Sequence, residues 1–293
     1  MVFYVIGNGF DQHYGLDTSY KSFKKYLTAV NRDVVERIDD LFYRYQMWNE
    51  PNNIEEWNTL EDMLAVFCHL DGDEIYEEAL SNAETDDDRA GYFDSPAWNV
   101  GYYTQYIDIL KEEFTNWINE IDVNINRDTY FMPSRDDFIL TFNYTETVEK
   151  NYSIDRSNIL HIHGKVGEDL IVGHNDYQVP DLYNVEWDED SDYRSTKAME
   201  EVDNVLIKAA ELYYKDSESV LERYRDFFKH INQSEKVVFL GLSCGDQDYI
   251  YVKEIVRCAE KIDFFWYDKG AMERFQDICN SENPKVQINF IKW

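Results

Sequence analysis

Short polar segments follow several apolar runs of the chain and contain side chains that can donate and accept hydrogen bonds or transfer protons. The first is Gly7-Asn8-Gly9-Phe10-Asp11, directly after the apolar run from Val2 to Ile6. Glycines let a ligand approach the main chain, whose N–H groups can bind a phosphate, and Asp11 can accept a hydrogen bond from a hydroxyl. A tight turn would need the same glycines, so the segment by itself does not decide between these two explanations.

Three later segments end apolar runs in the same way. They are Thr141-Phe142-Asn143-Tyr144, His161-Ile162-His163-Gly164 and Gly241-Leu242-Ser243-Cys244-Gly245-Asp246. Because ligands bind at the carboxyl ends of the strands in an open α/β sheet, we expect the polar side chains of all four segments to line one crevice. The candidates are Asn8, Asp11, Asn143, His163, His174, Ser243, Asp246 and Asp248.

The elements that must position these residues alternate along the chain. Apolar runs predict strands near 2–6, 138–142, 159–162, 170–172, 237–240, 263–267 and 286–291. Helical periodicity and capping residues predict helices near 17–27, 199–214, 220–231 and 249–258, with loops at 7–15 and 181–196. This alternation predicts a Rossmann-like, doubly wound, mostly parallel α/β sheet.

A long helical stretch separates the first two predicted strands. Apolar residues recur at helical spacing from residue 31 to about residue 126, interrupted by a solvated segment at 85–88. We therefore predict a large helical insertion or cap over 31–133, and a nucleotide-binding α/β domain made of 1–30 and 134–293.

Composition limits the classes of protein to consider. With 293 residues, of which 44% are hydrophobic and 16% aromatic, the chain can bury a large core. A formal net charge of −31 opposes binding to nucleic acid or to an anionic membrane surface. The four cysteines lack CxxC or metal-site spacing, and no apolar segment has the length of a transmembrane helix. We therefore expect a cytoplasmic protein with reduced thiols whose partner is a small-molecule nucleotide.

The motifs, in this order, resemble the abortive infection AbiH family, a bacterial anti-phage group. The matching segments are Ile6 to Asp11, Phe142 to Thr145, His161 to Gly164 and Gly241 to Asp248. The segment with Trp57, Leu60 and Glu61 resembles the W-x-x-L-E element of that family. The resemblance spans nearly the whole chain and implies an effector of phage defence that responds to a phage-derived trigger.

The same order is similar, more distantly, to SIR2-like domains, whose glycine turn, T-x-N, histidine-glycine and G-x-S elements form an NAD site. This resemblance implies that Asn143 and His163 are catalytic and that the protein self-associates. It implies nucleotide contacts from Gly7, Asn8, Gly9, Phe10, Asp11, Gly241, Ser243 and Asp246. The departures are Gly7-Asn8-Gly9 in place of G-A-G, Thr145 in place of Asp, and the lack of a zinc-binding cysteine module. They favour cleavage of NAD+ as a substrate, without a metal, over protein deacetylation.

The two catalytic candidates suit cleavage of the bond between nicotinamide and ribose. The leaving group is already cationic, so the enzyme has to position the ribose and supply water. An imidazole titrates near neutral pH, so His163 can act as base toward a ribose hydroxyl or that water. Asn143 can orient either group, because a carboxamide both donates and accepts. Alternatively, Asn143 is the N-cap of a helix, since Glu146 follows three residues later.

Other readings of the same residues lead to other functions. In a strand, His161 and His163 would point to one face and, with His174, could bind a metal in a nucleotide hydrolase or nuclease. For His161 we prefer a packed imidazole with satisfied hydrogen bonds. A third hypothesis is a non-catalytic nucleotide-binding sensor. Cys244 is better explained as a small buried residue than as a nucleophile, and Glu61 as a surface carboxylate unless it faces the site.

Overall fold

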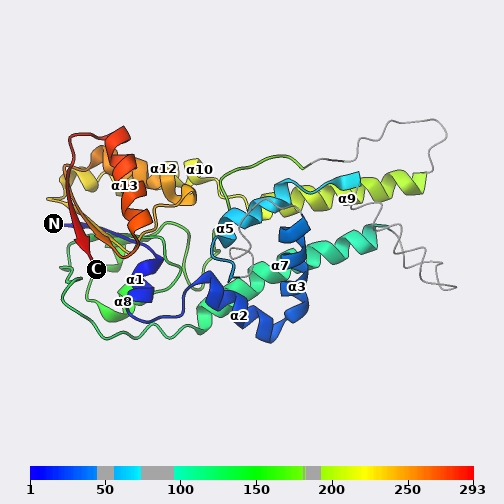
Figure 1. The fold of residues 1–293 in the computed structure, drawn as a ribbon, viewed down its shortest axis with the longest axis horizontal. Coiled ribbons are helices and arrows are strands. Elements are labelled where there is room, and N and C mark those ends of the chain that lie inside the picture. Colours follow the sequence, from blue (N-terminus) through cyan, green and yellow to red (C-terminus); the bar gives the residue numbers. More distant parts are fainter. Residues whose placement is uncertain (45–55, 74–95, 181, 183–192) are drawn as a thin grey trace. The chain divides into compact units, whose positions relative to one another are not determined.

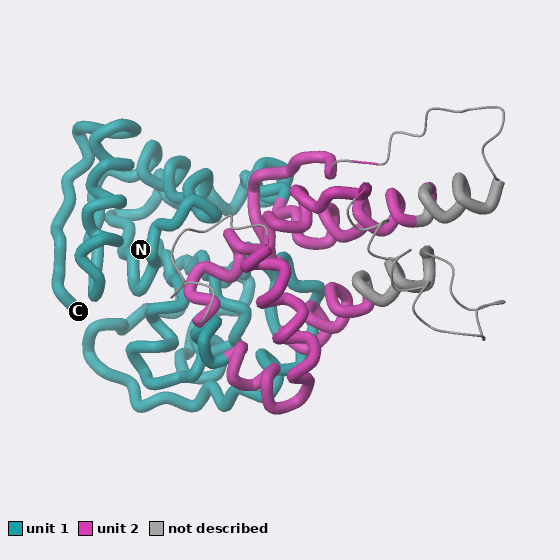
Figure 2. The backbone as a smooth tube through the Cα atoms, turned by 45° about the vertical axis from the view of Figure 1, so that its right-hand side comes forward, with its two compact units in different colours: residues 1–22, 115–171, 216–293 teal, residues 23–114, 172–215 magenta. Residues whose placement is uncertain are grey.

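The computed structural model describes residues 1–44, 56–73, 96–180, 182 and 193–293. They form two compact units, shown in Figure 2. Unit 1 comprises Met1–Ser22, Thr115–Ile171 and Asp216–Trp293, and unit 2 comprises Phe23–Phe114 and Val172–Lys215. The second stretch of unit 2 is a difference from the division predicted above, which places 172–215 with the sheet.

Unit 1 contains a six-stranded sheet in which every pairing is parallel. The strands are β1 (Phe3–Ile6), β2 (Phe138–Thr141), β3 (Ile159–His161), β4 (Val237–Leu240), β5 (Lys261–Trp266) and β6 (Gln287–Lys292). Their order, β3-β2-β1-β4-β5-β6, is that of the Rossmann fold. The predicted fold class is therefore confirmed, and the strand order reverses between β1 and β4.

Helices cover both faces of this sheet (Figure 1). One face carries α10 (Ser217–Arg223), α12 (Tyr249–Cys258) and α13 (Lys269–Glu282), and the other carries α1 (Asn8–His13) and α8 (Thr147–Asn151). The side chains of β1 alternate between two cores: Phe3 and Val5 pack in one, Tyr4 and Ile6 in the other. All four are buried, as expected for a central parallel strand.

Three local predictions for unit 1 are wrong. The expected loop over 7–15 contains helix α1, which begins directly after Gly7. The expected strand at 170–172 is an irregular segment, because a run of three apolar residues can be buried without strand pairing. The expected helix at 220–231 is divided into α10, α11 (Arg225–Phe228) and the 3₁₀ turn η3 (Ile231–Gln233). Two further 3₁₀ turns are η2 (Arg156–Asn158) and η4 (Asp246–Asp248).

Unit 2 is helical in the residues described. Its elements are α2 (Tyr20–Val30), α3 (Arg32–Arg44), α5 (Leu60–Met63), the 3₁₀ helix η1 (Leu64–Cys68), α7 (Pro96–Glu120) and α9 (Tyr193–Leu212), of which α2 and α7 extend a few residues into unit 1. Trp57 is buried against Phe23 and Phe42, and its indole N–H donates to Asp39 at 2.7 Å. The segment predicted at 85–88 lies outside the described residues, as does most of the loop predicted at 181–196, whose last residues belong to α9.

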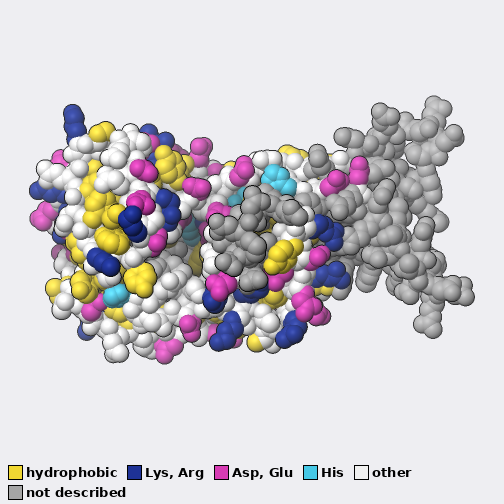
Figure 3. Space-filling view, in the orientation of Figure 1, with side chains coloured by type: hydrophobic (Ala, Val, Ile, Leu, Met, Phe, Trp, Pro, Cys, Tyr) yellow, Lys and Arg dark blue, Asp and Glu magenta, His cyan; other side chains and the backbone are white. Residues whose placement is uncertain are grey.

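Two surface properties accompany this fold. On the visible face of unit 1, Lys and Arg side chains are scattered among Asp and Glu side chains rather than gathered together (Figure 3). Among the described helices, none combines the length and apolar character needed to cross a membrane.

Candidate functional site

The glycines after β1 and β4 lie where the strand order reverses, and they allow two chain segments to touch. A Cβ on Gly7 or Gly9 would lie 2.7 Å from the carbonyl oxygen of Gly241. Gly241 has φ +67°, and its own Cβ would lie 2.1 Å from the backbone nitrogen of Phe10. The Gly9 N–H donates to the Gly241 carbonyl at 2.8 Å, and the Phe10 N–H donates to that of Gly7 at 2.9 Å. Packing therefore accounts for these glycines without a ligand, and their phosphate contacts remain a prediction.

Two neighbours in the same segment also have contacts within unit 1. The Asn8 side chain donates to the carbonyl of Thr18 at 2.8 Å, which connects the start of α1 with the segment that precedes α2. Phe10 is fully buried and packs edge-on against Tyr14 and Phe131. Each of these two side chains therefore has a structural role within unit 1. The nucleotide contacts predicted for Asn8 and Phe10 remain a prediction.

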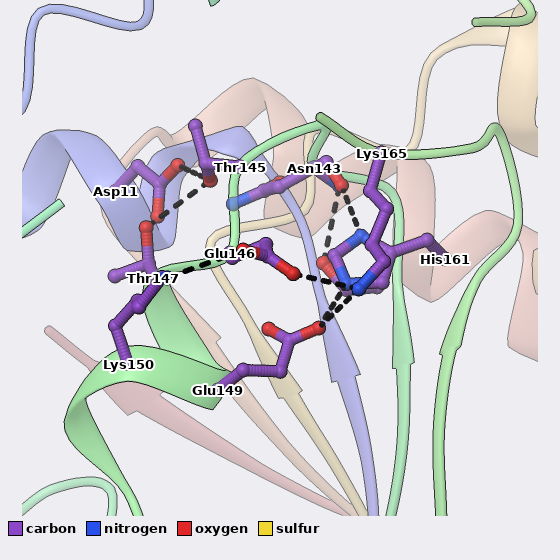
Figure 4. A network of polar contacts seen from close by, with 10 residues as sticks. Asp11, Asn143, Thr145, Glu146, Thr147, Glu149, Lys150, His161 and Lys165 are labelled. Carbon is purple, nitrogen blue, oxygen red and sulfur yellow. Dashed lines mark hydrogen bonds and ion pairs between the residues drawn. The ribbon is translucent and has the colours of Figure 1, made fainter. Parts of the chain in front are cut away.

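Asp11 is the centre of a buried polar network (Figure 4). Thr145 Oγ1 donates to Asp11 Oδ2 at 2.5 Å, and Thr147 Oγ1 donates to Thr145 Oγ1 at 3.1 Å. Burial raises the pKa of Asp11, although the hydrogen bond from Thr145, polar contacts with Thr147 and Asn143, and the charge of His161 oppose this rise. The network connects α1 with the segment after β2, which are far apart in sequence.

Asn143 is held by its backbone as well as by its side chain. Its N–H donates to Thr141 Oγ1 at 3.1 Å, and its carbonyl accepts from His161 Nδ1 at 2.8 Å. Glu146, not Asn143, is the residue before the first turn of α8, so the N-cap interpretation is wrong. Within the described part of the chain, Asn143 Oδ1 and Asp11 Oδ1 are buried oxygens without a hydrogen-bond donor.

His161 is the last residue of β3, and both of its ring nitrogens have partners. Nδ1 lies against the Asn143 carbonyl and Nε2 lies 2.7 Å from Glu149 Oε1. Burial would raise the pKa of Glu149, but the hydrogen bond and charge of His161, together with the charge of Lys165, hold it below its ordinary value. The packed imidazole that we preferred for His161 is what the structure shows. Glu149 is a residue that the sequence analysis missed.

His163 lies beyond the end of β3, in a turn, so the prediction that it shares a strand face with His161 is wrong. Its ring is surrounded by the rings of Phe142, Tyr144 and Tyr251, and its Nε2 lies 4.0 Å from Asp248 Oδ1. The sequence indicated both acids of the D-x-D motif, and the structure brings Asp248 rather than Asp246 to the histidine.

Asn143 and His163 follow adjacent strands at the same edge of the sheet, as predicted. Their exposed fractions are only 6% and 3%, so they do not line an open crevice. The parallel sheet explains why the two residues share an edge. Their burial comes from aromatic packing and backbone contacts, which residue spacing in the sequence does not predict.

The segment after β4 contributes little to this network. Ser243 and Asp246 are both exposed, and the carbonyl of Ser243 accepts from Arg274 Nη2 at 2.9 Å. Cys244 is buried, has φ +54°, and burial raises the pKa of its thiol far above the ordinary value. A thiolate nucleophile is therefore disfavoured at Cys244, in agreement with the sequence analysis.

Unit 2 contains a second polar group of four residues: Glu61, Cys68, His174 and Lys215. Lys215 Nζ lies 2.8 Å from Glu61 Oε2, and the lysine side chain has no exposed surface. His174 Nε2 lies 3.7 Å from Cys68 Sγ, and burial lowers the pKa of His174 to about 4. Among the described residues, no three His, Cys, Asp or Glu side chains are arranged to hold a metal ion.

The strand order and the helices on both sheet faces define unit 1 as a Rossmann-like α/β domain with a buried polar network after its central strands. The family model for bacteriophage abortive infection AbiH matches residues 3–267, and the chain belongs to this family. Searches of curated proteins and of solved structures gave no match. Family membership indicates a role in abortive infection by bacteriophage. The likeness to SIR2-like domains remains a prediction.

Proposed function

We propose that this protein is an abortive infection effector that hydrolyses NAD+ to nicotinamide and ADP-ribose. The observation that carries the proposal is the pair of buried acceptors, Asp11 Oδ1 and Asn143 Oδ1, which the described residues leave without donors. Buried polar atoms are rarely left unsatisfied, and a ribose supplies hydroxyl donors. The position beside the reversal of strand order, where Rossmann domains bind nucleotides, supports the same ligand.

The chemistry of the network suits a transition state with positive charge. Cleavage of the nicotinamide bond develops charge on the ribose, and the Asp11 carboxylate and Asn143 oxygen present negative potential to it. Asn143 would hold the ribose or the attacking water, and His163 would take a proton from one of them. Asp248, 4.0 Å from His163, would favour the protonated imidazole that results.

Burial of the two catalytic candidates has a functional consequence. Because Asn143 and His163 are almost fully buried, substrate can reach them only when this part of unit 1 becomes accessible. An effector with this property stays inactive until it is triggered, which fits a role in abortive infection. The test therefore has to include infected cells as well as purified protein.

The experiment compares the wild type with Asn143→Ala and His163→Ala. Cells that express each chain are infected with phages that the wild type restricts, and NAD+ and nicotinamide are followed over time. We expect NAD+ loss only with the wild type, and a fall of at least about a hundredfold in turnover by each variant. Asn280→Ala, which removes an exposed carboxamide from α13, is the matched control and should behave as the wild type does.

The same assay separates the other candidate functions. Unchanged NAD+ during restriction by the wild type would reject NAD+ hydrolysis. Retention of intact nucleotide by the purified protein would instead support a binding or sensing role. Loss of activity in a chelator, restored by divalent ions, would support a metal-dependent hydrolase.

A further inference from the structure

The His161 ring lies between two groups that can only accept hydrogen bonds. One is the Asn143 carbonyl, 2.8 Å from Nδ1, and the other is the Glu149 carboxylate, 2.7 Å from Nε2. The charge of Lys165, whose Nζ lies 3.7 Å from Glu149 Oε1, favours the ionised carboxylate independently of His161. A ring with an acceptor at each nitrogen can donate to both only when it carries two ring protons, and therefore a positive charge.

This charged pair is closed off from water. The side chains of His161 and Glu149 are 5% and 3% exposed. Lys165 Nζ adds a second positive charge 3.7 Å from Glu149, and it also contacts Glu146 at 2.7 Å. A buried ion pair in good geometry is costly to break, since either partner would be left as an uncompensated charge. The pair is therefore a rigid support rather than a flexible surface contact.

The support acts on Asn143. The Asn143 carbonyl is fixed by His161 and its N–H by Thr141, so its backbone is held on both sides. Its side-chain amide is in polar contact with Asp11, and the charge of His161 opposes the rise that burial causes in the pKa of that acid. A shift of the histidine would move the carboxamide and change the electrostatic potential at Asp11 together.

We propose that Glu149 and His161 form a charged pair that positions Asn143 for the reaction. Both are positioning residues, since they act through Asn143 rather than on the substrate. The inference rests on the proposed function for its kinetic consequence, whereas the charge state of His161 can be measured without any substrate. Neither His161 nor Glu149 is then available as a metal ligand.

The first test is nuclear magnetic resonance of the full chain labelled with ¹⁵N in its histidine rings and side-chain amides. In the wild type at neutral pH we expect both His161 nitrogens to be protonated. In Glu149→Gln one of them should lose its proton and the Asn143 amide resonances should shift. In Glu149→Asp, which keeps the charge, His161 should remain doubly protonated. A neutral His161 ring in the wild type would overturn the proposal, whether or not any variant folds.

The second test is kinetic and uses a control from the same part of the chain. In extracts of infected cells, where the effector is triggered, Glu149→Gln should lower kcat for NAD+ by about tenfold while changing the KM for NAD+ by less than about twofold, because the substrate still binds but Asn143 is misplaced. Glu146→Gln removes a carboxylate that contacts Lys165 but not His161, and should leave both constants unchanged.

The outcomes distinguish the two proposals. If the wild type cleaves no NAD+ in infected cells, the proposed function fails, while the His161 and Asn143 resonances still report on the charged pair. A folded Glu149→Gln variant with unshifted Asn143 resonances and full kcat would refute the positioning role alone.

Discussion

In unit 2 a buried ammonium meets a carboxylate, with Lys215 Nζ 2.8 Å from Glu61 Oε2, whereas in unit 1 the buried Asp11 is bonded to neutral hydroxyl and amide groups. The first arrangement neutralises its charges locally. The second leaves one carboxylate oxygen without a donor among the described residues, and burial raises the pKa of the acid. A network of this kind costs stability unless a ligand completes it, which supports the proposal that unit 1 binds the substrate and that the Glu61–Lys215 pair is structural.

The largest effects are expected at two glycines, one in each unit. Gly241→Ala would place a Cβ 2.1 Å from the Phe10 nitrogen in unit 1, and Gly173→Ala would place one 1.7 Å from the Tyr213 carbonyl oxygen in unit 2. Each should lower the free energy of unfolding by more than about 4 kcal/mol or prevent folding. Gly15→Ala, which has φ +81° and open space around it, should cost only about 1–2 kcal/mol. Urea denaturation measures all three, and equal losses would contradict the close-approach explanation.

The second prediction concerns the ion pair of unit 2. Glu61→Gln removes the carboxylate next to the fully buried Lys215 ammonium and should cost about 3–5 kcal/mol of unfolding free energy. The double variant Glu61→Gln/Lys215→Met removes both charges and should recover part of that loss. If Glu61→Gln abolished NAD+ cleavage with no loss of stability, the assignment of this pair to structure would be wrong.

The prediction with the smallest expected effect concerns pH. Acid should lower the free energy of unfolding through a group in unit 2 and raise it through a group in unit 1. The pKa of His174 falls from about 6.5 in the unfolded chain to about 4 in the fold, so the unfolded state binds more protons between these values. Unit 2 should therefore lose stability as pH falls from about 6.5 to 4, by at most about 1.4 kcal/mol per pH unit. The pKa of Asp11 is raised, so protonation of Asp11 favours the folded state.

Two variants separate these contributions in urea titrations at several pH values. His174→Gln should flatten the loss of stability below pH 6.5, and Asp11→Asn should remove the opposing gain and make that loss steeper. An unchanged pH dependence in His174→Gln would show that another group is responsible.

The alternation of apolar runs and helical segments in the sequence was enough to predict a parallel sheet. It also predicted the edge of the sheet at which the polar residues meet. Apolar runs that are followed by the segments with Asp11, Asn143 and His163 predict strands, and parallel strands bring their carboxyl ends to one edge. The family motifs were also legible in the sequence. The loop expected at 7–15 and the strand expected at 170–172 failed because runs this short do not distinguish a turn, a helix and an irregular segment.

What only the tertiary structure decided is which polar groups satisfy one another. Asp11 meets Thr145 across 134 residues, and Lys215 meets Glu61 across 154. The pairing of His161 with Glu149, 12 residues apart, depends on how α8 packs beside β3. Such contacts follow from the path of the backbone and not from local spacing, because hydrogen bonds need atoms within about 3 Å that sequence separation does not specify. The sequence therefore determined at which edge of the sheet the polar residues gather, and packing determined which of their atoms have a partner.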